Sequence, residues 1–392
     1  MPSELANSLL ILGAGQGLFL ALLLASKRAN STANRLLAVA MVAFALFILQ
    51  GVYYARGFEE QYPQFIGVSV PLVYLFGPIL YLYTEVVSHG GHTFHRRWLL
   101  HFIPVTMVVL WLVPFYAQSG EAKLAFLRRM QESGPPTDVA LIEVLQYLHG
   151  FVYVALTFRV LRRHGERLRA AYSAIERVNL NWLRDLLIGT AGVWAVATGI
   201  ELADAAGIPM ADWVHRLTPL ALSILVYAIG YMGLQQPEIF RHPPSQPPSA
   251  ISPQPAPINE EPTAGGPLSG YGKSGLTETE AAERLRQLRT LMEEKHPYRR
   301  SQLTLQELAD EMGMSTHNLS QVINTQAGKS FYDFINGYRA EEAMKRLRDP
   351  KSAHLTILAI AEESGFNSKA TFNAFFKRHA GLTPSAYRAN PS

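Results

Sequence analysis

Near its C-terminus the chain reads Leu303-Thr304-Leu305-Gln306-Glu307-Leu308-Ala309-Asp310-Glu311-Met312-Gly313-Met314, and 52 positions later Leu355-Thr356-Ile357-Leu358-Ala359-Ile360-Ala361-Glu362-Glu363-Ser364-Gly365-Phe366. The two stretches align without a gap, and a second helical pattern follows each, at 315–324 and 367–377. The order helix, glycine turn, helix is that of a helix-turn-helix unit, which places its second helix in the major groove of DNA. The repeat therefore predicts two such units in tandem.

The second helix of each unit has an apolar face and a polar face. Leu319 and Ile323 in the first unit correspond to Phe372 and Phe376 in the second, so these side chains are expected to face the core. Ser315 stands where it can cap the first of these two helices. The polar faces are predicted to bind DNA through ten side chains: Thr316, His317, Ser320, Gln321, Asn324, Ser368, Lys369, Asn373, Lys377 and Arg378.

The second unit and the residues after it carry a more specific signature. It runs Ala359-Ile360-Ala361-Glu362-Glu363-Ser364-Gly365-Phe366-Asn367-Ser368 and continues with Phe372, Phe375-Phe376-Lys377-Arg378, Gly381, Thr383-Pro384 and Tyr387-Arg388. This signature closely resembles that of the AraC/XylS family of bacterial transcription regulators. The resemblance covers residues 280–389. It implies a domain of seven helices with two recognition helices in successive major grooves, about 34 Å apart, and an N-terminal part that senses a signal.

Two positions depart from the pattern of many family members. Gln321 and Ala374 stand where an arginine often contacts guanine. A glutamine can still read adenine, whereas an alanine offers only an apolar contact to a thymine methyl group. We therefore expect the first unit to carry most of the base specificity. The second unit is expected to contribute more of the phosphate contacts, through Lys369, Lys377 and Arg378.

The N-terminal half has the composition of a membrane protein. Charged residues make up 17% of the 392-residue chain, below the roughly 25% of an ordinary soluble protein. A bilayer core of about 30 Å needs roughly 20 mostly apolar residues as helix. The polar faces that helices of a soluble protein would show are mostly missing. Seven such apolar stretches are present, at about 6–26, 35–55, 66–87, 98–117, 140–161, 182–202 and 217–234.

Lys and Arg are distributed unevenly between the loops that join these stretches. The loop after the first apolar stretch, together with every second connecting segment after it, holds thirteen Lys and Arg residues in total. The loops that alternate with these segments hold five. Loops rich in Lys and Arg stay in the cytoplasm. We therefore expect a multi-pass protein of the bacterial inner (cytoplasmic) membrane, with its N-terminus outside and its C-terminal domain in the cytoplasm.

The sequence thus predicts an all-α protein in three parts. Residues 1–234 form a transmembrane sensor domain of seven helices, and residues 275–392 form the double helix-turn-helix domain. Between them, 235–274 are rich in Pro, Ser and Gly and include Pro243-Pro244-Ser245-Gln246-Pro247-Pro248. Such a composition cannot bury enough apolar surface to fold, so this stretch is expected to be a disordered linker.

Catalytic and metal chemistry find little support. The chain has no cysteine, which excludes disulfides and thiolate sites, and neither an HExxH motif nor a nucleophile elbow is present. His89, His92 and His95 are loosely spaced in a basic loop with no carboxylate beside them, so a solvated loop is expected there, with no metal site. Neither a cofactor nor enzymatic activity is expected.

Polar residues deep within the apolar stretches are few. Gln146 and His149 lie three positions apart on one predicted helix, with Tyr153 one turn further along the same face. They are candidates for a ligand pocket, and hydrogen bonds between helices are the alternative.

These features predict a membrane-anchored, sequence-specific DNA-binding regulator that couples a membrane or extracytoplasmic signal to promoter binding. The expected partners are double-stranded DNA, the lipid bilayer, an unidentified small-molecule or membrane signal, and a second copy of the chain, since pairing would raise DNA affinity. The alternative is a membrane transporter or sensor whose C-terminal domain is a protein-interaction module. Charges at mid-membrane or an inverted repeat would favour a transporter.

Overall fold

The computed structural model describes residues 2–27, 31–89, 95–176, 178–208, 214, 217–234 and 276–389. The expected linker at 235–274 therefore lies outside the described residues. The chain divides into two compact units: Met1–His164 with Leu180–Arg241, and Gly165–Asn179 with His242–Ser392. Residues 165–179 thus belong to the same unit as the C-terminal domain. Both units are helical, and the described residues contain no β-strand, so the all-α prediction is confirmed.

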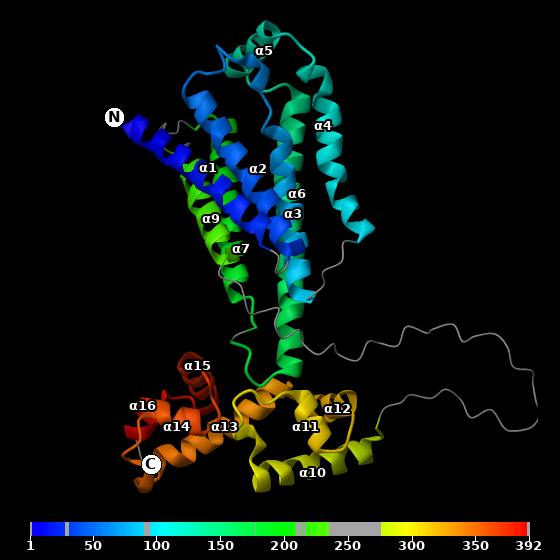
Figure 1. The fold of residues 1–392 in the computed structure, drawn as a ribbon, viewed down its shortest axis with the longest axis vertical. Coiled ribbons are helices and arrows are strands. Elements are labelled where there is room, and N and C mark those ends of the chain that lie inside the picture. The colour runs from blue at the N-terminus through cyan, green and yellow to red at the C-terminus, as the bar shows by residue number, and fades with distance from the viewer. Residues whose placement is uncertain are drawn as a thin grey trace, which may run out of the picture. The chain divides into compact units, whose positions relative to one another are not determined.

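The first unit consists of long apolar helices (Figure 1). Its helices are α1 (Pro2–Ser26), α2 (Ser31–Ala55), η1 (Pro63–Phe65), α3 (Val70–His89), η2 (Arg96–Phe102), α4 (Ile103–Tyr116), α5 (Gly120–Ser133), α6 (Thr137–Ala171), α7 (Asn181–Ala205) and α9 (Leu217–Leu234). All seven apolar stretches found in the sequence are helical. Among the described residues, six segments are long and apolar enough to cross a membrane, and the α9 region contributes a shorter apolar helix, Ser223–Met232. The short helix α5, between α4 and α6, was not predicted from the sequence.

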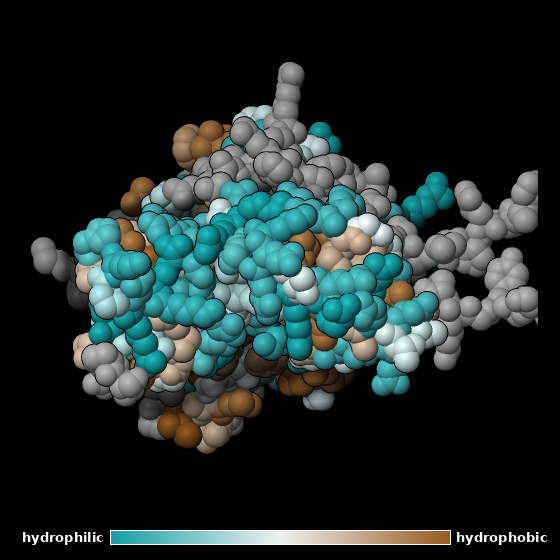
Figure 2. Space-filling model, turned by 90° about the horizontal axis from the view of Figure 1, so that it is seen from below, coloured by the Kyte–Doolittle hydropathy of each residue, from teal (hydrophilic) through white to brown (hydrophobic). Residues whose placement is uncertain are grey.

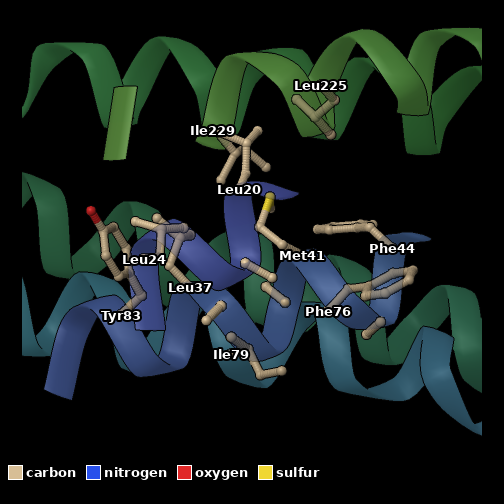
Figure 3. Packing of buried hydrophobic residues seen from close by; sticks show 14 of the residues in the cluster. Leu20, Leu24, Leu37, Met41, Phe44, Phe76, Ile79, Tyr83, Leu225 and Ile229 are labelled. Atoms are coloured by element: carbon tan, nitrogen blue, oxygen red, sulfur yellow. The ribbon is translucent and has the colours of Figure 1, made fainter. Parts of the chain in front are cut away.

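The core of this unit is formed where α1, α2, α3, α7 and α9 pack together (Figure 3). Phe44 and Phe76 stack with their ring centroids 4.1 Å apart. Large apolar side chains also cover the outside of the unit, where Leu12 is 67% and Leu22 is 72% exposed. A bundle in water would present polar residues there, so this pattern is the one expected of helices surrounded by lipid.

The second unit contains the seven α-helices that the family resemblance implied. They are α10 (Glu278–Lys295), α11 (Leu305–Glu311), α12 (Thr316–Gln326), α13 (Phe331–Arg348), α14 (Ile357–Glu363), α15 (Lys369–Ala380) and α16 (Pro384–Ala389), with single turns η3 (Pro297–Arg299) and η4 (Pro350–Ser352). Two hydrophobic clusters lie along the chain, one around α10 to α12 and one around α14 to α16, and α13 contributes to both. The face of this unit seen in Figure 2 is mainly hydrophilic.

The repeated sequence folds into the same structure twice. In the first copy Thr304 and Glu307 form a reciprocal capping box at the start of α11, with N···O distances of 3.2 and 2.8 Å. In the second copy Thr356 caps α14 alone, because Ala359 stands where the first copy has its glutamate. Each side-chain cap satisfies one of the backbone N–H groups that a helix start leaves without a partner.

The two turn glycines, Gly313 and Gly365, have different surroundings. Both have a positive φ, of 61° and 98°. A Cβ atom at Gly313 would meet nothing within 4 Å, whereas one at Gly365 would lie 2.4 Å from the carbonyl oxygen of Tyr298 and 3.0 Å from Nε of Arg339. Only the turn at Gly365 is therefore in close contact with the backbone of another segment.

This difference makes a matched pair of substitutions informative. Gly313→Ala should lower the free energy of unfolding of the second unit by about 1–2 kcal/mol, the cost of a left-handed backbone for a residue with a Cβ. Gly365→Ala should cost at least about twice as much, because the Tyr298 carbonyl must also move. Hydrogen exchange of α13 amides in the full chain measures both losses, and equal losses would contradict the close approach.

Candidate nucleic-acid interface

The first recognition helix, α12, is positioned by its cap and its apolar face. The Ser315 hydroxyl accepts a hydrogen bond from the Asn318 amide at 3.2 Å. Three buried side chains fix the rotation of the helix about its axis: Leu319, Val322 and Ile323. Of the five predicted DNA-binding residues on this helix, His317 and Asn324 are exposed, and the other three are half-buried: Thr316, Ser320 and Gln321. Helical spacing places His317, Gln321 and Asn324 opposite the core residues, whereas Thr316, seven positions before Ile323, lies at the edge of the buried face.

The second recognition helix, α15, is built in the same way. The Ser368 hydroxyl accepts from the Thr371 amide at 3.4 Å, so this predicted DNA-binding residue is also the helix cap. The aromatic side chains facing the core are Phe372, Phe375 and Phe376. The four predicted residues within the helix are all exposed: Lys369, Asn373, Lys377 and Arg378. The sequence did not single out Asn367, which is also exposed, just before the cap.

Arg378 has a partner within the protein. Its guanidinium forms an ion pair with Asp333 at 2.7 Å and lies 4.7 Å from the centre of the Phe375 ring. Asp333 is in the first turn of α13, so Arg378 ties α15 to that helix. Its side chain remains 58% exposed. A phosphate could therefore approach Arg378 only in competition with, or beside, the Asp333 carboxylate.

The two recognition helices differ in charge. The eleven residues of α12 include no Lys, Arg, Asp or Glu, whereas α15 carries Lys369, Lys377 and Arg378 and no carboxylate. Sequence-independent affinity for DNA comes mainly from cations near phosphates, and base readout comes from polar side chains in the groove. The arrangement is thus suited to base contacts by α12 and to phosphate contacts by α15.

Both helices are held in place through α13, at whose centre lies a buried arginine. Arg339 is 1% exposed. Its Nε donates to the Tyr298 carbonyl and its Nη2 to the Arg300 carbonyl, each at 2.7 Å. Burial lowers the pKa of the guanidinium from 12.5 to about 10, so it remains charged at neutral pH. Sequence reasoning missed this residue, although its spacing of four from both Ile335 and Ala343 places it on the buried face.

In the first unit, the residues suggested as a ligand pocket lie on α6. The His149 ring packs against the rings of Tyr74 and Tyr153, with centroids 5.2 and 4.8 Å away. Its Nε2 is buried and has no hydrogen-bond partner among the described residues. Gln146 is half-buried. A cavity of about 50 Å³ lies within the bundle beside Tyr153, but neither Gln146 nor His149 lines it.

The described histidines near the third apolar stretch make separate contacts. His89 pairs with the Glu85 carboxylate at 3.1 Å, a contact that the sequence reasoning did not anticipate. His101 donates to or accepts from the Tyr153 hydroxyl at 2.8 Å. His92 lies outside the described residues, and among those described no three potential ligands come together.

Comparison with known proteins supports the geometry of the C-terminal domain. Residues 308–390 match a family of helix-turn-helix domains. The relatives include "Probable transcription factor PqrA" of Proteus vulgaris, 32% identical over 21% of this chain and 66% of that protein, and a protein of Streptomyces lividans named as an AraC-like transcription regulator, 28% identical over 23% of this chain and 28% of that protein. The chain thus spans less than two thirds of either relative.

One solved structure also aligns, that of a protein of unknown function from Listeria innocua. It is 26% identical and covers 27% of this chain and 94% of the other, with a TM-score of 0.24, which is too low to carry an argument.

The fold and the comparisons together define a tandem helix-turn-helix domain of the kind found in transcription regulators. Within that class, the C-terminal domain is similar to that of AraC-like transcription regulators, as the sequence signature indicated. The two relatives named cover only 21% and 23% of this chain.

Proposed function

We propose that the protein is a membrane-anchored transcription regulator that binds DNA sequence-specifically and responds to a signal at the membrane. The observation that carries this proposal is the combination, in one chain, of an AraC-type domain with six helices long and apolar enough to cross a bilayer. The apolar residues on the outside of the first unit support the membrane location. The uneven distribution of Lys and Arg supports a cytoplasmic position for the DNA-binding domain.

DNA recognition is divided between the two helix-turn-helix units. His317 and Gln321 on α12 contact base edges, and Gln321 is suited to adenine, to which a glutamine can form two hydrogen bonds. On α15, Lys369 and Lys377 contact phosphates and fix the position of the domain on the duplex. The remaining predicted residues contribute polar contacts around these four. Two chains paired in one membrane would bind more tightly than one.

The signal is received in the first unit. We place the ligand site at the Tyr74, His149 and Tyr153 cluster, with Gln146 one turn before His149 on α6. The buried Nε2 of His149 is a polar group without a described partner, and a small molecule with a hydrogen-bonding group could satisfy it.

Selection from random duplexes by the full chain in lipid nanodiscs, at two salt concentrations, tests the DNA-binding function. We expect a motif with two clusters of specified bases one helical turn apart, because the two recognition helices occupy successive major grooves. If binding is salt-sensitive but independent of sequence, the proposal of sequence-specific DNA recognition is wrong. No binding by the folded protein would favour a protein-interaction module.

Substitutions on the selected operator test the division of roles. Gln321→Ala should cost about 1–3 kcal/mol and relax the preference at one base pair. Lys377→Ala should weaken binding on all sequences alike and reduce the slope of log K against log salt by about 1. Titrations at several salt concentrations measure both effects. Equal loss on all sequences from both substitutions would contradict these roles.

The orientation in the membrane can be tested with single cysteines, because the natural chain has none. Ser133→Cys, at the exposed end of α5, should react with an impermeant maleimide on spheroplasts. Glu166→Cys, exposed near the end of α6, should react only after the membrane is permeabilised. The reverse pattern would contradict the orientation, and labelling of both sites on sealed spheroplasts would contradict the membrane crossing between them.

A further inference from the structure

The end of α6 and the loop that leads to α7 are built into the DNA-binding domain. Residues 165–179 cluster with the C-terminal domain, although 165–171 belong to α6 and 172–179 join it to α7, and both helices are apolar enough to cross a membrane. Tyr172 forms an isolated antiparallel bridge with Thr304, the capping residue of α11. Ile175 packs against the hydrophobic cluster around α14 to α16. The segment therefore contacts both helix-turn-helix halves.

Ser173 is at the centre of this contact. It is 1% exposed, and all of its polar atoms are bonded to the domain. Its amide and its hydroxyl both donate to the Leu303 carbonyl, at 3.2 and 2.6 Å. Its own carbonyl accepts from Nδ2 of Asn336 at 2.9 Å and from Nη1 of Arg339 at 3.1 Å. Such a fully satisfied buried serine is a feature of a packed interior and not of a loop that touches a surface by chance.

The segment also completes the hydrogen bonding of the buried arginine. Nη2 of Arg339 donates to the Ser173 hydroxyl at 3.0 Å, so both terminal nitrogens of the guanidinium use Ser173. Withdrawal of the segment would leave donors of a buried charge without these partners, which is unfavourable. The described contacts of the segment fall on 303–304 and α13 and on the cluster around α14 to α16. They do not include the predicted DNA-binding residues of α12.

We infer that the segment 169–176 is the element through which the first unit controls DNA binding; this inference rests on the proposed function. When docked, it holds the two helix-turn-helix halves in the relative orientation that DNA requires, which lowers the entropy lost on binding. Because α6 and α7 flank the segment, a signal that moves their ends pulls it from α13. Undocking then weakens DNA binding.

Two substitutions of Ser173, studied in the full chain in lipid nanodiscs, test the inference. Ser173→Trp cannot fit the buried site, so the amides of 171–176 should exchange at least about tenfold faster, and operator affinity should fall about tenfold. Ser173→Ala should cause a smaller loss of exchange protection and a smaller loss of operator affinity. It serves as the deciding variant if Ser173→Trp unfolds α10 to α16. Ser364→Ala is the matched control, because it removes a buried hydroxyl that bonds only within its own helix, to the Ile360 carbonyl. It should change affinity by less than about twofold.

A reversible cross-link tests the sign of the effect. Tyr172 and Thr304 face each other across a bridge, where Cα atoms are about 4.5–5.5 Å apart, a distance that a disulfide can span. In the Tyr172→Cys, Thr304→Cys double variant, the oxidised protein should bind the operator at least as tightly as the reduced protein. The comparison uses one protein, so loss of the Thr304 cap affects both states.

Each outcome bears on the inference separately from the proposed function. If 171–176 undock and the affinity stays unchanged or rises, or if the oxidised form binds tenfold more weakly, the inference is wrong. Rapid exchange of 171–176 in the unaltered chain would also overturn it. If the unaltered chain binds no operator, the proposed function fails, while the exchange measurement still decides whether the segment docks.

Discussion

The C-terminal domain depends on the hydrogen bonding of one buried cation, the guanidinium of Arg339. A charged group in the interior is tolerated only when its donors are satisfied. Here the Arg339 donors bond to the carbonyls of Tyr298 and Arg300 and to Ser173. These acceptors come from two separate stretches of chain. The arginine therefore joins its own helix, α13, to the start of the first helix-turn-helix half and to the segment 165–179. The same crowding requires glycine at 365, where a Cβ would meet Nε of Arg339.

Around this centre the two halves have the same backbone and different chemistry. The first recognition helix is polar and uncharged, and the second is cationic. Arg378 shows that a charge on a recognition helix is not always free for DNA, because Asp333 holds it at 2.7 Å. Under the proposed division of roles, with base readout by α12 and phosphate contacts by α15, each half can change its specificity or its affinity with little effect on the other.

Much of this structure could be predicted from the sequence, because it is encoded locally. The capping residues, the turn glycines and the spacing of apolar residues determined both helix-turn-helix units, and all seven apolar stretches are helical. The role of Arg339 could not be predicted in this way. Periodicity places it on the buried face, but its partner Ser173 lies 166 positions away, in a loop that composition assigns to the membrane half. Helix α5 was missed although Ser119 caps it and its apolar residues recur at helical spacing, because the prediction considered only stretches long enough to cross a membrane.

The most direct test of this account is hydrogen exchange of the full chain carrying Arg339→Met, with Lys345→Met as control. Methionine keeps much of the side-chain length and leaves the carbonyls of Tyr298 and Arg300 without their donor. We predict that amides in α11 and α14 lose protection together, by about 3 kcal/mol, because one buried network joins both halves. Lys345→Met, at an exposed position, should change the protection of these amides by less than about 0.5 kcal/mol. Loss of protection confined to the residues around position 339, with α11 and α14 unaffected, would contradict the account.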